Sequence, residues 1–315
     1  MKAHLRSLGI VIPVKDETES IPILLNSINC ELSYVKNLRV VLVDDGSSTP
    51  VINDELSQLC KELNFKVTVI ELSRNFGKEA AIRAGLQHIK GNVEFVAIMD
   101  GDGQHPVSSV KQMFEHMMEN ENLESSVAVP KSKSDRYMYR LLRSIFQNIM
   151  GREFSHFESD LLVIRSRIIE KLDQFPEKAI RIRDIVRMIC TNVAKFEYLP
   201  EKSIRNSLKA KSRWSFGSLI DQAFIAIIGH DKRLFSLITR ATALTLIISV
   251  AVFVYTMLAT LSAGTRSGTT TILFVLTLMF IVQILALFVT IFYLRITLLE
   301  VKNRPRFLVA NTWSN

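Results

Sequence analysis

Two aspartates, Asp100 and Asp102, have the residue type and spacing that suit binding of a metal ion. They follow residues 93–99, an apolar run that predicts a buried strand, and Gly101 and Gly103 open the turn around them. Carboxylates at this spacing can face one cation, and Mg²⁺ typically combines one or two carboxylates with substrate phosphates and water. A plain acidic β-turn is the alternative interpretation of the pattern.

Other polar clusters also follow apolar runs. Residues 15–20 follow the run at 8–14, residues 44–48 follow 38–43, and residues 73–79 follow 66–72. In open α/β sheets, ligands bind beyond the carboxyl ends of the strands, so we expect these clusters to share one edge of a sheet. Helix capping and ordinary turn chemistry remain the alternatives for the acids, and solvated surface charge for Arg74 and Lys78.

The order of the predicted elements indicates the fold class. Helical patterns at 21–28, 54–63 and 80–89 alternate with the strands, giving a β-α-β-α-β series. This order predicts an α/β fold with a mostly parallel, Rossmann-like sheet that is covered on both faces.

The composition restricts the partners of the protein. The chain has 315 residues, a formal charge of +8 and a sequence pI near 9.4, which favours an anionic partner: nucleic acid, a phosphorylated substrate or a membrane surface. Its cysteines, Cys30, Cys60 and Cys190, lack metal-ligand spacing and fit reduced thiols in a cytosolic domain. The basic residues concentrate near the apolar C-terminal runs, so a phosphate-bearing lipid explains the charge better than nucleic acid.

Two charge-free apolar runs, 241–263 and 270–294, predict a transmembrane hairpin, because each exceeds the roughly 20 residues that span a bilayer. Basic flanks on both outer sides place the termini in the cytoplasm. The expected domains are a cytoplasmic catalytic domain (1–205), a basic interfacial segment (206–236), the hairpin (237–296) and a cytoplasmic tail (297–315).

Four motifs occur in order: V-I-P-V-K-D-E, V-D-D-G-S-S, S-R-N-F-G-K-E-A-A and D-G-D-G-Q-H-P. With them the chain resembles the family 2 glycosyltransferases of GT-A fold. More narrowly, it resembles the polyprenyl-phosphate glycosyltransferases, such as bactoprenol glucosyltransferase and dolichol-phosphate mannose synthase. Residues 300–307 also match the E-V-K-x-R-P-x-Y tail of the bactoprenol enzymes.

The resemblance implies a nucleotide-sugar site and a metal site. Asp102 would be the principal ligand of Mg²⁺ or Mn²⁺, assisted by Asp100. Residues matching the donor site are Pro13, Asp16, Glu17, Asp45, Arg74, Asn75, Gly77, Lys78 and Gln104. We call the D-G-D-G-Q-H-P segment, residues 100–106, the acidic loop. The family more often has D-A-D-L-Q-D-P there, and we interpret the differing His105 as a loop residue rather than an extra metal ligand.

The resemblance also implies residues that face the acceptor. Asp160 corresponds to an acid that either orients the acceptor or acts as a general base, which makes Asp100, Asp102 and Asp160 the expected catalytic residues. Arginines expected to hold the acceptor phosphate are Arg136, Arg140, Arg143 and Arg183.

The expected enzyme is an inverting hexosyltransferase at the bacterial inner membrane. It would move a hexose from a nucleotide sugar, UDP-glucose or another UDP-hexose, to undecaprenyl phosphate on the cytoplasmic face, for O-antigen, lipopolysaccharide or another surface glycan. A homo-oligomer such as a tetramer is expected from the same resemblance. The alternatives are a catalytically silent partner that binds nucleotide sugars and a family 2 transferase with a different acceptor.

Overall fold

The computed structural model describes residues 7–131, 160–175, 180–199, 268–302 and 305–315, and scattered residues between 244 and 258. The chain forms two compact units. One comprises Met1–Arg136, Ser155–Trp214 and Arg304–Asn315, and the other comprises Tyr137–Phe154 and Ser215–Asn303. The segment after the apolar runs therefore belongs to the same unit as the N-terminal half of the chain.

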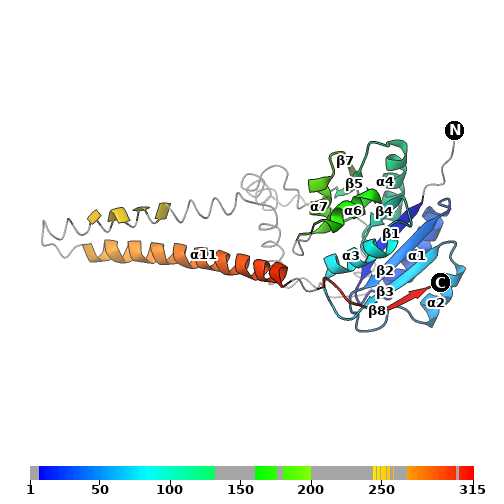
Figure 1. Ribbon diagram of the computed structural model, residues 1–315, viewed down its shortest axis with the longest axis horizontal. Coiled ribbons are helices and arrows are strands. Elements are labelled where there is room, and N and C mark those ends of the chain that lie inside the picture. The colour runs from blue at the N-terminus through cyan, green and yellow to red at the C-terminus, as the bar shows by residue number, and fades with distance from the viewer. Residues whose placement is uncertain are drawn as a thin grey trace. The chain divides into compact units, whose positions relative to one another are not determined.

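The first unit is built around one sheet (Figure 1), to which the described residues contribute eight strands in the order β7-β5-β6-β4-β1-β2-β3-β8. The strands β1 to β4 lie parallel to one another, whereas β6 is antiparallel to β4 and β8 to β3. The α/β class expected from the sequence is confirmed. The strands are β1 (Leu8–Val14), β2 (Leu38–Asp44), β3 (Lys66–Leu72), β4 (Phe95–Ile98), β5 (Ser125–Pro130), β6 (Leu162–Arg165), β7 (Val193–Tyr198) and β8 (Val309–Ser314).

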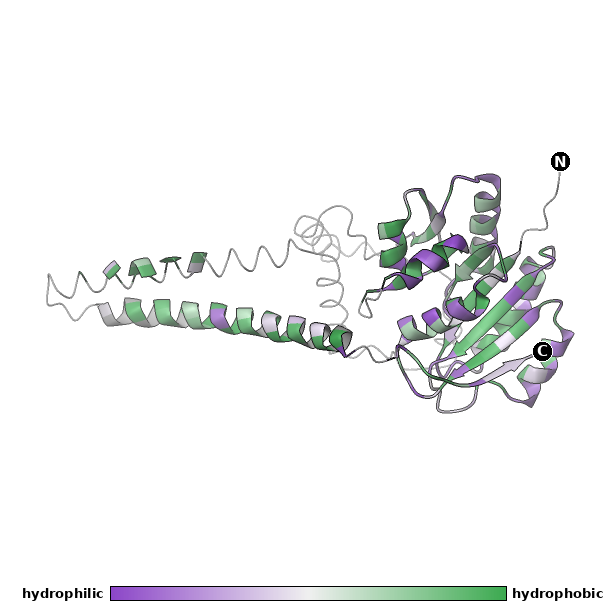
Figure 2. Ribbon diagram, viewed as in Figure 1, coloured by the Kyte–Doolittle hydropathy of each residue, from purple (hydrophilic) through white to green (hydrophobic). Residues whose placement is uncertain are grey.

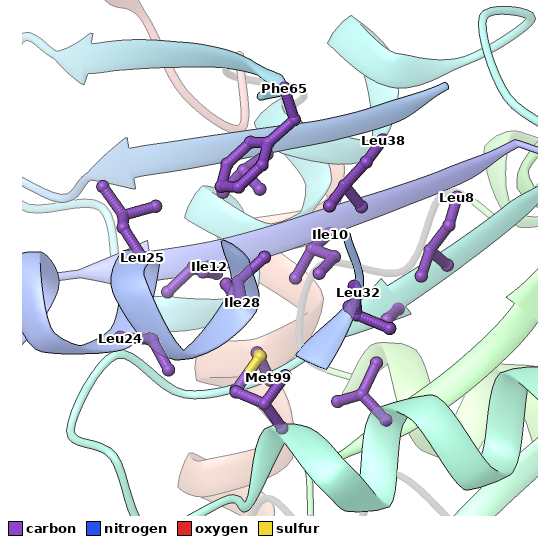
Figure 3. Close-up of a cluster of buried hydrophobic side chains, with 14 of the residues drawn as sticks. Leu8, Ile10, Ile12, Leu24, Leu25, Ile28, Leu32, Leu38, Phe65 and Met99 are labelled. Carbon is purple, nitrogen blue, oxygen red and sulfur yellow. The ribbon is translucent and has the colours of Figure 1, made fainter. Parts of the chain in front are cut away.

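Helices cover both faces of the sheet and enclose two hydrophobic cores. One core lies under α1 (Ser20–Glu31), α2 (Asp54–Glu62) and α4 (Val107–Glu119), and Figure 3 shows part of it. The other lies under α3 (Lys78–Ile89), α6 (Arg167–Asp173) and α7 (Ile182–Ile189). Because successive strand residues point to opposite faces, Ile10 and Ile12 of β1 enter the first core and Val11 enters the second. This two-sided burial explains why the central strands are continuous apolar runs.

Helix α3 lies close against the sheet, which matters because its first residue is Lys78. The close approach depends on Gly85, since a Cβ at that position would overlap the side chain of Val11 in β1. The start of α3 is also set by a glycine: Gly77, its N-cap, has φ +97°, a conformation that side-chain-bearing residues rarely adopt.

The edge strand β8 was not predicted from the sequence, which assigned residues 297–315 to a tail. It pairs antiparallel with β3, with Thr312 opposite Ile70. The neighbouring Asn315 strengthens the attachment, because its Oδ1 accepts a 2.9 Å hydrogen bond from the amide of Val67. The last segment of the chain thus completes one side of the sheet.

The second unit contains α11 (Thr269–Val301), a helix of 33 residues that is rich in hydrophobic side chains (Figure 2). Within the described residues, no helix meets both the length and the hydropathy needed to cross a membrane. The spans expected at 241–263 and 270–294 are therefore not confirmed and stay a prediction. The basic segment expected at 206–236 lies outside the described residues.

Candidate active site

The polar clusters noted in the sequence gather where the parallel strands end. In the register of the sheet, Val14 of β1 lies opposite Asp44 of β2, and Asp44 lies opposite Glu71 of β3. The acidic loop follows directly after β4, which pairs with β1. The loops that carry the predicted donor-site residues therefore leave neighbouring strands at one edge of the sheet.

A cluster of four charges joins separate parts of this unit. The ammonium of Lys78 lies 2.5 Å from Asp100 Oδ1 and 2.6 Å from Asp160 Oδ2. Arg183 Nη1 donates a 2.8 Å hydrogen bond to Asp160 Oδ1. We call Lys78, Asp100, Asp160 and Arg183 the ion cluster. It brings the start of α3, the end of β4, the segment before β6 and the helix α7 to one point.

The ion cluster keeps its central groups charged near neutral pH. Burial opposes the charge on Asp160, but the facing Lys78 and Arg183 hold its carboxyl pKa well below the ordinary value. Burial likewise opposes the charge on Lys78, yet Asp100 and Asp160 raise its pKa above the ordinary value. A carboxylate with a strongly lowered pKa is a weak proton acceptor. Asp160 in this arrangement is thus better suited to orienting groups than to general-base catalysis.

His105 shapes the acidic loop from within. Its ring is buried, and its Nδ1 accepts a 3.1 Å hydrogen bond from the backbone amide of Asp100. The ring also packs edge-on against Tyr198, with a centroid distance of 6.0 Å. Burial lowers the His105 pKa, so the ring stays neutral with its proton on Nε2. In this arrangement Nδ1 is used by the backbone, and the interpretation of His105 as a loop residue stays a prediction.

Asp45 holds the loop that precedes α3. Its Oδ1 accepts a 2.7 Å hydrogen bond from the amide of Phe76, and its Oδ2 accepts one of 2.9 Å from the amide of Gly77. Burial raises the Asp45 pKa, although the two amides act in the opposite direction. The carboxylate therefore fixes the path of the chain into Lys78, and its predicted contact with the nucleotide stays a prediction.

The loops after β1 and β2 are tied to each other. The amide of Asp16, a residue with φ +49°, donates to Ser47 Oγ at 2.8 Å, and the amide of Ser48 donates to Asp16 Oδ1 at 2.6 Å. Glu17 reaches the acidic loop, since a Cβ at Gly101 would lie 2.6 Å from Glu17 Oε2. The absence of a side chain at Gly101 thus makes room for this carboxylate.

The remaining predicted residues differ in their placement. Pro13 is buried in β1, whereas Arg74, Asn75 and Gln104 are exposed at the strand ends. The guanidinium of Arg74 lies 4.9 Å from the ring centroid of Phe76. Predicted acceptor residues outside the described part of the chain are Arg136, Arg140 and Arg143.

Sequence reasoning missed one side chain that supports the ion cluster. Glu79 Oε2 accepts a 2.9 Å hydrogen bond from the amide of Ile182, which links α3 to the first turn of α7. Burial raises the pKa of this carboxyl. Glu79 follows Lys78 directly in the S-R-N-F-G-K-E-A-A motif, but nothing in the local pattern indicates that its side chain meets a segment more than 100 residues away.

The acidic loop fits a divalent cation that shares its ligands with a substrate. Asp100 and Asp102 supply hard carboxylate oxygens, and Asp100 already faces a cation, the ammonium of Lys78. The described residues contain no group of three or more His, Cys, Asp and Glu side chains that would hold a metal by themselves. This donor set suits Mg²⁺ or Mn²⁺ with phosphates and water as further ligands, and does not suit a closed structural site.

Comparison with known proteins identifies the class. Residues 9–184 match the model of the family "Glycosyl transferase family 2", and the chain belongs to this family. It is a glycosyltransferase.

The chain is also similar to individual proteins of this kind. The chain is 25% identical to the putative glycosyltransferase CsbB of Bacillus subtilis over 96% of this chain and 91% of the relative. It is 30% identical to an undecaprenyl-phosphate 4-deoxy-4-formamido-L-arabinose transferase of Edwardsiella ictaluri over 52% of this chain and 51% of that protein. A solved glucosyl-3-phosphoglycerate synthase of Mycobacterium tuberculosis is 12% identical with a TM-score of 0.49, covering 71% of this chain and 79% of that one, a likeness too weak to support any argument about this site.

Proposed function

We propose that this glycosyltransferase moves a hexose from a UDP-hexose, such as UDP-glucose, to undecaprenyl phosphate. The observation that carries the proposal is the pairing of Asp160 with both Lys78 and Arg183. A phosphate acceptor is already anionic near neutral pH and needs cations to hold it rather than a strong base. An acceptor hydroxyl, by contrast, would have to lose a proton, and the lowered pKa of Asp160 makes this carboxylate poorly suited to accept it.

The donor side of the proposal rests on the loops at the strand ends. Asp100 and Asp102 would hold Mg²⁺ or Mn²⁺, which when bound supplies positive charge to the departing diphosphate. Lys78 stands at the N-terminus of α3, where the helix dipole also favours a phosphate. Arg74 and Asn75 in the preceding loop, with Gln104, would complete the donor contacts.

The transfer would be a single displacement. An oxygen of the acceptor phosphate forms a bond to the anomeric carbon while the bond from that carbon to the nucleotide diphosphate breaks, and UDP leaves with the electron pair. Attack from the face opposite the leaving group inverts the anomeric centre. Arg183 and the arginines at 136, 140 and 143 would hold the attacking phosphate, while Asp160 keeps Arg183 and Lys78 in place.

The proposal includes attachment to the cytoplasmic face of the bacterial inner membrane through the apolar runs 241–263 and 270–294, both free of charged residues. In α11, Leu276, Phe280 and Leu287 are 54%, 62% and 59% exposed. Large exposed apolar surfaces mark contacts with lipid or protein. Attachment to the membrane would bring the enzyme to its lipid acceptor. The proposal also includes a role in the modification of O-antigen or another surface glycan, and assembly as a homo-oligomer such as a tetramer.

The test is a transfer assay on membranes that contain the full chain. Wild type, Asp102→Asn and the control Asp173→Asn are incubated with labelled UDP-hexoses and undecaprenyl phosphate, and labelled lipid is measured. Asp173, the last residue of α6, is a matched carboxylate because its side chain forms an exposed ion pair with Lys90. We expect labelled lipid from the wild type and Asp173→Asn, and loss of about 100-fold or more in Asp102→Asn.

Two outcomes contradict the proposal. Labelled lipid from Asp102→Asn at the level of the wild type would remove Asp102 from the reaction. Label transferred by the wild type to another acceptor, with none on undecaprenyl phosphate, would show that the acceptor is wrong.

A further inference from the structure

Residues 306–308, which lie between α11 and β8 in sequence, contact two connections that lead into the ion cluster. We call them the tail segment. The carbonyl oxygen of Leu308 accepts a 2.8 Å hydrogen bond from the amide of Ser73. Arg306 Nη2 donates a 2.7 Å hydrogen bond to the carbonyl oxygen of Phe175. Ser73 and Phe175 are about 100 residues apart in the chain, and the tail segment is bound to both.

The tail segment also shares a hydrophobic core with these connections. Phe307 packs against the core under α3, α6 and α7, and so do Phe76 and Phe175. Phe76 belongs to the loop that Asp45 fixes, and Phe175 follows the end of α6. The aromatic residue of the tail segment and the aromatic residues of both connections therefore rest on one apolar surface.

The two connections deliver the two cations of the ion cluster. The loop that starts at Ser73 leads into Lys78, and α6, which ends just before Phe175, packs in one core against α7, which carries Arg183. Both cations bind opposite oxygens of the Asp160 carboxylate. The geometry at Asp160 therefore depends on where the loop before α3 and the helix α7 lie.

We propose that the tail segment is a positioning element of the active site, in which Arg306 and the carbonyl of Leu308 set the connections that carry Arg183 and Lys78. Its effect on transfer rests on the proposed function, while its effect on the two connections does not. The alternative is that Arg306 only helps to keep β8 on the edge of the sheet.

The experiment compares four full-length variants. Arg306→Met removes the hydrogen bond to Phe175, and Arg306→Lys keeps a cationic donor. Arg39→Met is the matched control, because Arg39 is a half-buried arginine near the amino end of β2 whose side chain donates a hydrogen bond to Asn37 Oδ1, away from the tail segment. Asn315→Ala loosens the attachment of β8, because it removes the bond to Val67, without touching the tail segment.

Two measurements are made on each variant: amide hydrogen exchange at residues 73–78 and 180–189, and kcat and KM for the labelled UDP-hexose. In Arg306→Met we expect exchange at 180–189 to accelerate and kcat to fall about tenfold, the size expected for a lost charged hydrogen bond, with KM changing less than about twofold. Arg306→Lys should recover most of both effects. Arg39→Met and Asn315→Ala should match the wild type at 180–189 and in kcat.

The outcomes separate this proposal from the proposed function. Unchanged exchange and kcat in Arg306→Met would overturn the positioning role, as would equal effects in Asn315→Ala. If Arg306→Met unfolds, the test moves to Arg306→Lys and a second variant, Phe307→Ala. The proposal is then supported if Arg306→Lys keeps the exchange pattern and kcat of the wild type and Phe307→Ala accelerates exchange at 73–78 or 180–189. Without faster exchange in Phe307→Ala, the proposal is not supported. Faster exchange in Arg306→Met, together with a wild type that labels no lipid phosphate, would support the positioning role and contradict the proposed acceptor.

Discussion

The two ends of the parallel strands carry charge in different ways. We call the side of the sheet where the carboxyl ends lie the carboxyl edge and the opposite side the amino edge. At the carboxyl edge, Lys78 and Arg183 are paired with the carboxylates of Asp100 and Asp160. At the amino edge, Lys36, Arg39 and Lys66 line a shallow surface hollow together with neutral residues. There burial, followed by the positive charges of Lys66 and Arg39, lowers the pKa of the nearby His88. Positive charge therefore occurs at both edges, whereas the four-charge ion cluster lies at the carboxyl edge.

The largest expected effect that tests this difference comes from Lys78→Met at the carboxyl edge. The substitution leaves Asp100 and Asp160 without the ammonium that faces both of them, and their mutual repulsion would disturb the site. We expect transfer to fall about 100-fold or more, since groups that stabilise charge in the reaction have effects of this size. Labelled lipid formed per unit of folded enzyme measures the loss. Retention of more than half the activity would place Lys78 outside the reaction.

The next largest effect concerns the contribution of Asp160 to the stability of the fold at different pH values. Its pKa is lower in the folded protein than the ordinary value of about 4, so its ionised form stabilises the fold above that value, and the contribution is lost as the pH falls through the folded pKa. Between pH 7 and pH 3, the melting temperature of the wild type should fall more than that of Asp160→Asn. Parallel curves for the two proteins would show that Asp160 is not held by its cations.

The smallest effect is expected at the amino edge. Arg39→Met and Lys66→Met remove positive charge from the hollow, and because the hollow lies at the opposite ends of the strands, kcat should stay within about twofold of the wild type. The same transfer assay provides the measurement. A loss as large as that in Lys78→Met would abolish the contrast between the two edges.

The sequence predicts the strands well because each central strand is buried on both faces. Residues 8–14 and 66–72 were expected as strands at the limits that β1 and β3 have in the structure. The strand β8 could not be predicted in this way, because V-A-N-T-W-S has neither a continuous apolar run nor a strict alternation, and four of its residues in a row are exposed. Its conformation comes from pairing with the edge of β3.

The four residues of the ion cluster were all singled out from the sequence, but their pairings were not. Sequence motifs pointed to Lys78, Asp100, Asp160 and Arg183, yet assigned them to separate donor, metal and acceptor groups. The bond between Lys78 and Asp160 joins residues 82 positions apart, and no local pattern encodes such a distance. The structure therefore adds the information that one lysine contacts both Asp100 of the acidic loop and Asp160, the acid expected to face the acceptor.

A double-mutant cycle on Lys78 and Asp160 tests the central claim most directly. The value of kcat/KM for transfer of labelled hexose to undecaprenyl phosphate is measured for the wild type, Lys78→Met, Asp160→Asn and the double variant. Since the two side chains act through one shared contact, the double variant should lose about as much as the worse single variant. A loss equal to the product of the two single losses would show that the residues act independently, and would contradict the ion cluster as a functional unit.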